Sequence, residues 1–141
     1  MDINSLDRFV KAQERMYQVA LKEIREGQKR SHWMWYIFPQ LRGLGTSSMA
    51  HTYGISGLDE AKAYLEHSWL SGRLYELCVS LLQHKDKSAY EIFGDIDEMK
   101  LKSSMTLFAL TSEDYTIFDQ VLEQFFGGEM DEVTVSLINE S

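Results

Sequence analysis

The sequence has little of what extracellular scaffolds and irregular chains need. Cys78 is the single cysteine among 141 residues, so no internal disulfide can form and nothing indicates an oxidising compartment. Pro39 is the single proline, and only nine glycines occur, which leaves little room for long irregular segments. Hydrophobic residues make up 44% of the chain, far from a disordered composition. We therefore expect one compact domain over residues 1–141, located in the cytoplasm.

Long apolar runs are also missing. The longest strongly apolar stretch, 33–38, is far below the roughly 20 residues that span a bilayer. The N-terminal string MDINSLDRFVKAQERM carries charges throughout and lacks the apolar core of a signal peptide. We expect no membrane-spanning segment and no membrane partner.

Basic residues are scarce in the second part of the chain. Residues 1–54 hold eight Lys/Arg against five Asp/Glu, residues 55–141 hold six against seventeen, and the net charge is −8. Proteins that bind nucleic acid normally present a wide basic face, so extended nucleic-acid binding is excluded. The local surplus of bases before residue 55 favours a small anion as partner.

Metal ligands are sparse as well. The four histidines lie between 16 and 19 residues apart, and no H-x-x-x-H pair occurs. We expect no metal site. No motif identifies a cofactor or an oligomeric state.

Helical periodicity covers nearly the whole chain. Apolar residues recur at helical spacing in 6–26, 56–67, 69–84, 88–94, 95–112 and 111–126, and glycines at 27, 94 and 127–128 predict helix ends. The segment 131–138 permits either a helix capped by Asp131 or a strand. The predicted class is all-α, an orthogonal bundle of about six to eight helices.

Hydroxyl and acidic residues before these segments predict N-caps. The helix predicted within 111–126 is expected to bury Tyr115, Phe118, Leu122 and Phe125. The predicted caps are Ser31, Thr46 or Ser47 or Ser48, Ser56, Ser88 in a capping box with Glu91, Asp95 or Asp97, and Thr111 or Ser112.

The stretch KRSHWMWYIFPQLRGLGTSS, residues 29–48, departs from this regularity. Bases flank a dense aromatic run, and Pro39 pushes Phe38 toward an extended conformation, so we expect a short helix and then coil through Gly45. Gly43 and Gly45 permit close backbone approach to an anion. The stretch therefore predicts a phosphate-sized pocket with aromatic walls. The alternative is that the aromatic residues are core and the glycines only turn the chain.

The helix EMKLKSSMTLFALTS is the second candidate region. It is apolar on most sides, which is typical of a buried helix, yet it carries Lys100, Ser103 and Ser104. A lysine on such a helix either extends to solvent or needs an anionic partner. Both interpretations remain open from the sequence.

Five strings, LDRFVKAQ, ALKEIREGQKRSHWMWYIFPQLRGLG, YGISGLDEAKAYLEH, GRLYEL and KLKSSMTLF, together resemble the bacterial and fungal family catalogued as domain of unknown function 1810. The similarity runs from about Leu6 to Ile138 and implies a compact helical domain without an established activity. Some relatives carry the label calpastatin, but that inhibitor is a disordered repeat protein and this composition is that of a folded domain. Arg42 lies outside the family signature. The signature matches Arg30, Ser31, His32, Trp33, Trp35, Pro39, Gln40, Gly43, Gly45, Tyr53, Gly54, Lys100, Ser103, Ser104 and Met105.

Together the two regions predict one small-molecule site, enzymatic or sensory. Arg30 and Lys100 would hold an anion, and a tryptophan would stack on a planar group such as a nucleobase. His32 is the candidate general acid or base. The alternative is a non-enzymatic interaction or structural module whose motif residues only pack. The predicted ligand-binding residues are Arg30, Ser31, Trp33, Trp35, Gln40, Gly43, Gly45, Lys100, Ser103 and Ser104.

Overall fold

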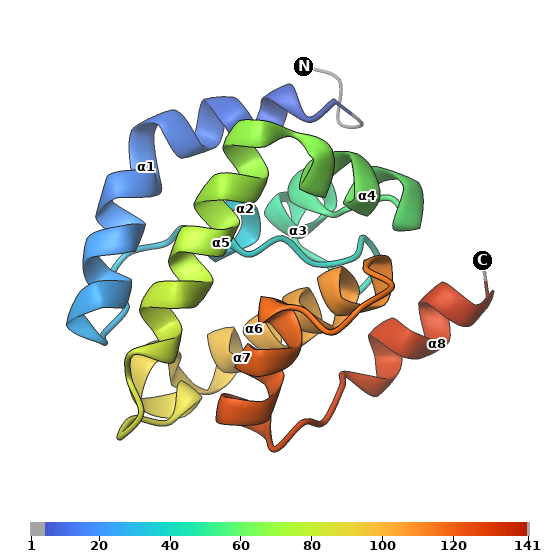
Figure 1. Cartoon of the computed structure of the whole chain (residues 1–141). Coiled ribbons are helices and arrows are strands. Elements are labelled where there is room, and N and C mark those ends of the chain that lie inside the picture. The colour runs from blue at the N-terminus through green and yellow to red at the C-terminus, as the bar shows by residue number, and fades with distance from the viewer. Residues whose placement is uncertain (1–4, 141) are drawn as a thin grey trace.

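The computed structural model describes residues 5–140, and the outer ends of the predicted 1–141 domain, residues 1–4 and 141, lie outside this range. Within the described range the chain forms helices and one isolated parallel bridge between Leu41 and Ile55, with no strand (Figure 1). The predicted all-α class is confirmed. The helices are α1 (Asp7–Glu26), α2 (Met34–Ile37), α3 (Ser48–Tyr53), α4 (Leu58–Glu66), α5 (Ser68–Leu82), α6 (Ala89–Thr111), α7 (Ile117–Phe126) and α8 (Glu132–Glu140).

The first helix ends at the predicted glycine. Gly27 adopts the left-handed conformation with φ 77°, which costs glycine little, and its N–H donates to the Ile24 carbonyl at 3.0 Å. The apolar face of α1 packs against α5, which lies beside it in Figure 1. Phe9 and Ile24 on that face are fully buried. The predicted amphipathic helix is therefore confirmed.

The predicted N-caps Ser31 and Ser56 are wrong because their polar groups have other partners. Helix α2 begins after Trp33, since the Ser31 hydroxyl donates to Glu23 at 2.6 Å instead of capping. Helix α4 begins after Gly57, and Ser56 donates its backbone N–H to the Glu60 carboxylate at 2.9 Å. The Ser31 hydroxyl thus bonds to another helix, and Ser56 contributes its backbone N–H instead of its side chain. Neither serine caps the helix that follows it.

The turn between α6 and α7 is longer than predicted. The hydroxyls of Thr111 and Ser112 donate to carbonyls one turn earlier, at 2.7 and 3.1 Å, so they close α6 and the predicted cap is wrong. Thr116 caps α7 in a capping box, in which the Asp119 carboxylate accepts the Thr116 N–H at 2.8 Å. Tyr115, predicted to be buried, precedes this cap and is exposed.

A glycine breaks α6 into two parts. The predicted capping box of Ser88 and Glu91 opens the helix, and Gly94 then leaves the helical region with φ 83° and ψ 171°. The predicted stop at Gly94 is confirmed. After Gly94 the first residues of the helix are exposed or half-buried, and the segment from Leu101 to Ala109 is buried except at Lys102.

The C-terminal segment is helical, so the strand alternative is wrong. Asp131 acts as the predicted cap: its carboxylate accepts the Thr134 N–H and hydroxyl at 2.9 and 2.6 Å. Helix α8 packs on α6 at the edge of the molecule (Figure 1). Of the helices within residues 5–140, none combines the length and the apolar content needed to cross a bilayer.

The glycine at the end of α3 fits where no larger residue would. A Cβ on Gly54 would lie 2.7 Å from the Arg42 Cα and 2.8 Å from the Ala50 carbonyl oxygen. Its φ of −66° and ψ of 135° suit any residue, so the cost of a side chain is steric. We expect Gly54→Ala to lower the free energy of unfolding in urea by about 1–3 kcal/mol.

The control for this substitution is Gly72→Ala, inside α5. Nothing lies within 4 Å of the added Cβ there, and alanine favours helix, so stability should rise by about 0.5–1 kcal/mol. Equal effects of the two substitutions would contradict the close approach at Gly54.

Candidate functional site

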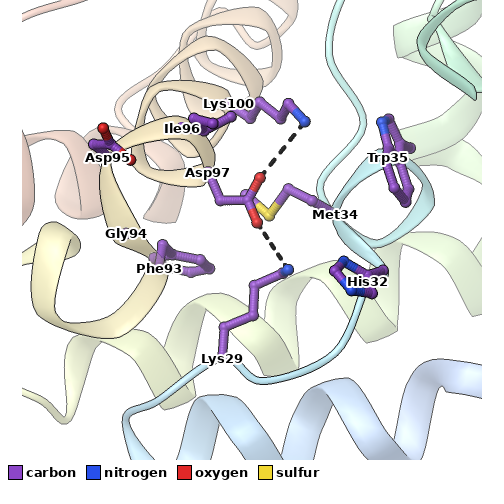
Figure 2. Close-up of a pocket in the computed structure, with 10 residues that line it drawn as sticks. All are labelled: Lys29, His32, Met34, Trp35, Phe93, Gly94, Asp95, Ile96, Asp97 and Lys100. Atoms are coloured by element: carbon purple, nitrogen blue, oxygen red, sulfur yellow. Dashed lines mark ion pairs between the residues drawn. The ribbon is translucent and has the colours of Figure 1, made fainter. Parts of the chain in front are cut away.

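A cavity of about 340 Å³ lies between the segment that follows α1 and the break in α6 (Figure 2). At its centre the Asp97 carboxylate lies 2.7 Å from the Lys29 ammonium and 3.5 Å from the Lys100 ammonium. We call this cavity the lysine cavity. It is lined by Lys29, His32, Met34, Trp35, Phe93, Gly94, Asp95, Ile96, Asp97 and Lys100.

The three charged side chains at the centre are largely enclosed. Their exposed fractions are 8% for Lys29, 19% for Asp97 and 25% for Lys100. Asp95 also lines the cavity, but it lies apart from the two lysines, and the ion pairs drawn in Figure 2 join them only to Asp97. Two ammonium groups therefore share one carboxylate, and the cluster carries an excess of positive charge.

Both lysines are held by the local fold. The Lys29 N–H donates to the Ile92 carbonyl at 2.8 Å, which ties the segment after α1 to the first part of α6. The Lys29 ammonium also lies 4.9 Å from the centre of the Trp33 ring. The Lys100 ammonium lies 5.2 Å from the centre of the Trp35 ring. Such cation–π contacts hold each ammonium beside an aromatic ring.

A second cavity of about 320 Å³ adjoins the first. Ile96 and Lys100 line both cavities, so the two share a boundary on α6. We call the second one the apolar cavity, because Leu44, Met99 and Val133 form much of its wall. Its full lining is Gln40, Leu44, Gly45, Ile96, Met99, Lys100, Ser103, Asp131 and Val133.

The structure brings part of the predicted site together. His32, Trp35 and Lys100 line the lysine cavity, and Gln40, Gly45, Lys100 and Ser103 line the apolar cavity. The two regions singled out in the sequence, 30–45 and 100–106, thus meet at Lys100. Arg30, Ser31, Trp33, Gly43 and Ser104 line neither cavity.

Glu23, which no sequence pattern singled out, accepts hydrogen bonds from Arg30, Ser31 and Trp33. Its Oε1 accepts the Arg30 N–H, the Ser31 N–H and the Trp33 indole N–H at 2.8, 3.0 and 2.9 Å, and its Oε2 accepts the Ser31 hydroxyl. Burial raises the pKa of Glu23, but these hydrogen bonds, that of the Ser31 hydroxyl first, outweigh it and hold the pKa at about 2. Ser31 and Trp33 therefore have internal partners.

The guanidinium of Arg30 points to another acid. It pairs with Glu26 on α1 at 2.7 Å, and both side chains are largely exposed. Arg30 therefore makes a surface ion pair and lines neither cavity. The sequence had proposed it as part of the anion site.

The remaining signature residues have packing or turn roles. Gly43 has φ 104° and open space around it, whereas a Cβ on Gly45 would lie 2.7 Å from the Ala50 Cβ. Ser103 donates its hydroxyl to the Met99 carbonyl at 3.1 Å. The Ser104 hydroxyl is fully buried and has no hydrogen-bond partner among residues 5–140. Gly45 thus lets the loop pack against α3.

The sequence patterns missed the acid at the centre of the site. Asp97 reads in the sequence only as a possible helix cap, and Lys29 only as one of several flanking bases. The available signal is the i,i+3 spacing of Asp97 and Lys100 on a helix that is apolar on most sides. Within residues 5–140 no group of three or more metal-binding side chains occurs.

Comparison with known proteins identifies the family and a similar solved structure, but neither description names an activity. A family model described as "Protein of unknown function (DUF1810)" matches residues 3–138. The crystal structure of the conserved hypothetical protein Rv1873 from Mycobacterium tuberculosis is 48% identical, with a TM-score of 0.94, and the match covers 98% of this chain and 99% of that one. None of the curated proteins compared with the chain matches it.

Proposed function

Because the chain belongs to the DUF1810 family, whose description assigns no activity, we propose a function from the site itself: binding of a small anionic molecule in the lysine cavity. The observation that carries the proposal is that Lys29 and Lys100 share the single carboxylate of Asp97 in a largely enclosed place. A partly desolvated ammonium is stabilised by an anionic partner. A phosphate or carboxylate bound beside Asp97, against the two ammonium groups, would balance the charge of the cluster.

The neighbouring side chains suit the rest of such a ligand. The indole of Trp35 faces the cavity and offers an apolar surface to a planar or aliphatic group. His32 lies beside it, exposed at the cavity wall. It would be the proton donor or acceptor of a reaction at the centre of the cavity, since Lys29, Asp97 and Lys100 are held in ion pairs.

Binding of inorganic phosphate, AMP and ribose 5-phosphate tests the proposal. At saturating concentration at least one of these anions should raise the melting temperature of the wild-type protein by several degrees, with ionic strength matched by NaCl. The substitution Lys100→Met should abolish the rise, because it removes one of the two ammonium groups and leaves the core unchanged.

The matched control is Lys22→Met, which removes an exposed lysine on α1 outside both cavities. This variant should respond like the wild type. The proposal is wrong if none of the three anions changes the melting temperature, or if the two lysine variants respond equally.

A further inference from the structure

The apolar cavity extends the lysine cavity along α6. Lys100 stands at the boundary, and its ammonium is directed toward Asp97 in the lysine cavity (Figure 2). A lysine places its aliphatic stem against apolar surface while the charged end lies elsewhere. A molecule bound to the Lys100 ammonium can therefore continue past its stem into the second cavity.

Apolar side chains are unusually exposed around this second cavity. Ile96 is 70% exposed, Met99 53% and Val133 56%, and all three line it together with the partly buried Leu44. They come from α6, from α8 and from the loop before α3. Isolated exposed apolar residues are common, but a group that surrounds one cavity indicates a binding surface.

The polar groups in this wall are mostly satisfied within the protein. The Ser103 hydroxyl donates to the Met99 carbonyl, and the Asp131 carboxylate accepts both hydrogen bonds from Thr134. The backbone carbonyl of Gln40 accepts the Ile55 N–H at 2.9 Å. Apart from the Gln40 side chain, the Asp131 carboxylate and the Lys100 side chain at the boundary, the surface offered to a ligand is therefore apolar.

We propose that the ligand is an amphiphilic anion, with an acidic head beside Asp97 against the Lys29 and Lys100 ammonium groups and an aliphatic body along Leu44, Met99 and Val133. This inference rests on the proposed function and adds the second part of the ligand to it. The acidic head alone would occupy only the lysine cavity. Each methylene group buried in the apolar cavity should tighten binding by about fourfold.

A series of n-alkyl phosphates tests the inference. Calorimetric titration compares inorganic phosphate with methyl, butyl, hexyl and octyl phosphate, each below its micelle-forming concentration. We expect the dissociation constant to fall by about fourfold per methylene until the cavity is filled. The gain per methylene should persist at high salt, because burial of apolar surface is not screened.

Two neutral substitutions locate the aliphatic body. Met99→Gln and Val133→Gln should weaken octyl phosphate binding by about tenfold and leave inorganic phosphate binding unchanged. Val79→Gln on α5 is the matched control, because Val79 is exposed but lines neither cavity. It should leave both dissociation constants unchanged.

The outcomes separate this inference from the proposed function. Inorganic phosphate binding without any dependence on chain length would overturn the amphiphile and leave the anion site standing. Equal weakening by Met99→Gln and Val79→Gln would also overturn it. If neither inorganic phosphate nor any alkyl phosphate binds, the anion site itself is wrong and the inference fails with it.

Discussion

Replacing Arg8 by methionine should lower the free energy of unfolding by about 3–5 kcal/mol. The Arg8 guanidinium is fully buried, and it pairs with both Glu60 carboxylate oxygens, at 2.9 and 3.1 Å. Its other hydrogen bonds go to backbone carbonyls of Ser5, Thr52 and Gly54. Without the guanidinium the buried Glu60 carboxylate loses its counter-charge, which is the costly part of the change.

Urea unfolding of single and double variants separates this cost from lost packing. The double variant Arg8→Met, Glu60→Leu should be more stable than Arg8→Met alone, because no unpaired charge remains buried. Arg25→Met is the control: its pair with Glu76, at 3.6 Å, is largely exposed and should be worth less than about 0.5 kcal/mol. A loss for Arg8→Met no larger than for Arg25→Met would show that the buried pair does not form.

Replacing Glu23 by alanine should cost about 2–4 kcal/mol of unfolding free energy at neutral pH. The carboxylate accepts hydrogen bonds from the Trp33 indole and from the backbone and hydroxyl of Ser31. The indole is fully buried, so its N–H would lose its partner without access to water. Glu26→Ala is the matched control on the same helix, since Glu26 makes only an exposed pair with Arg30.

Acid should reduce the difference between wild type and Glu23→Ala. The folded-state pKa of Glu23 is lowered from 4.5 to about 2, so its contribution is fully present above pH 4.5 and is lost as the pH falls toward 2. The lowering corresponds to roughly 3 kcal/mol. Stability measured in urea between pH 7 and pH 2.5 should therefore fall more steeply for the wild type. Parallel pH profiles of the two proteins would contradict the hydrogen-bonded carboxylate.

Local signals in the sequence predicted the helices well. The apolar spacing of α1 and the stops at Gly27 and Gly94 depend on residues within a few turns, and the structure confirms them. The caps were less predictable, because a hydroxyl can bond in several directions. The Ser31 hydroxyl donates to Glu23 on α1, and this partner is determined by the tertiary structure and not by the local sequence.

Long-range contacts explain what the sequence did not predict in the candidate site. Lys29 and Asp97 meet only because the chain returns between them, and no spacing rule connects them. Glu23 occupies the end of an amphipathic helix, where a carboxylate is usually solvated. Its burial depends on the segment that folds back over α1. Partners of this kind become visible only in three dimensions.

The isolated bridge between Leu41 and Ile55 closes the loop that contains α3. The Arg42 N–H donates to the Ile55 carbonyl at 2.8 Å, and the Ile55 N–H donates to the Gln40 carbonyl at 2.9 Å. With the Arg8 contacts to residues 52 and 54, these bonds hold the base of loop 42–54. Leu44 and Gly45 of this loop line the apolar cavity, so the bonds at its base also fix the position of one wall of that cavity.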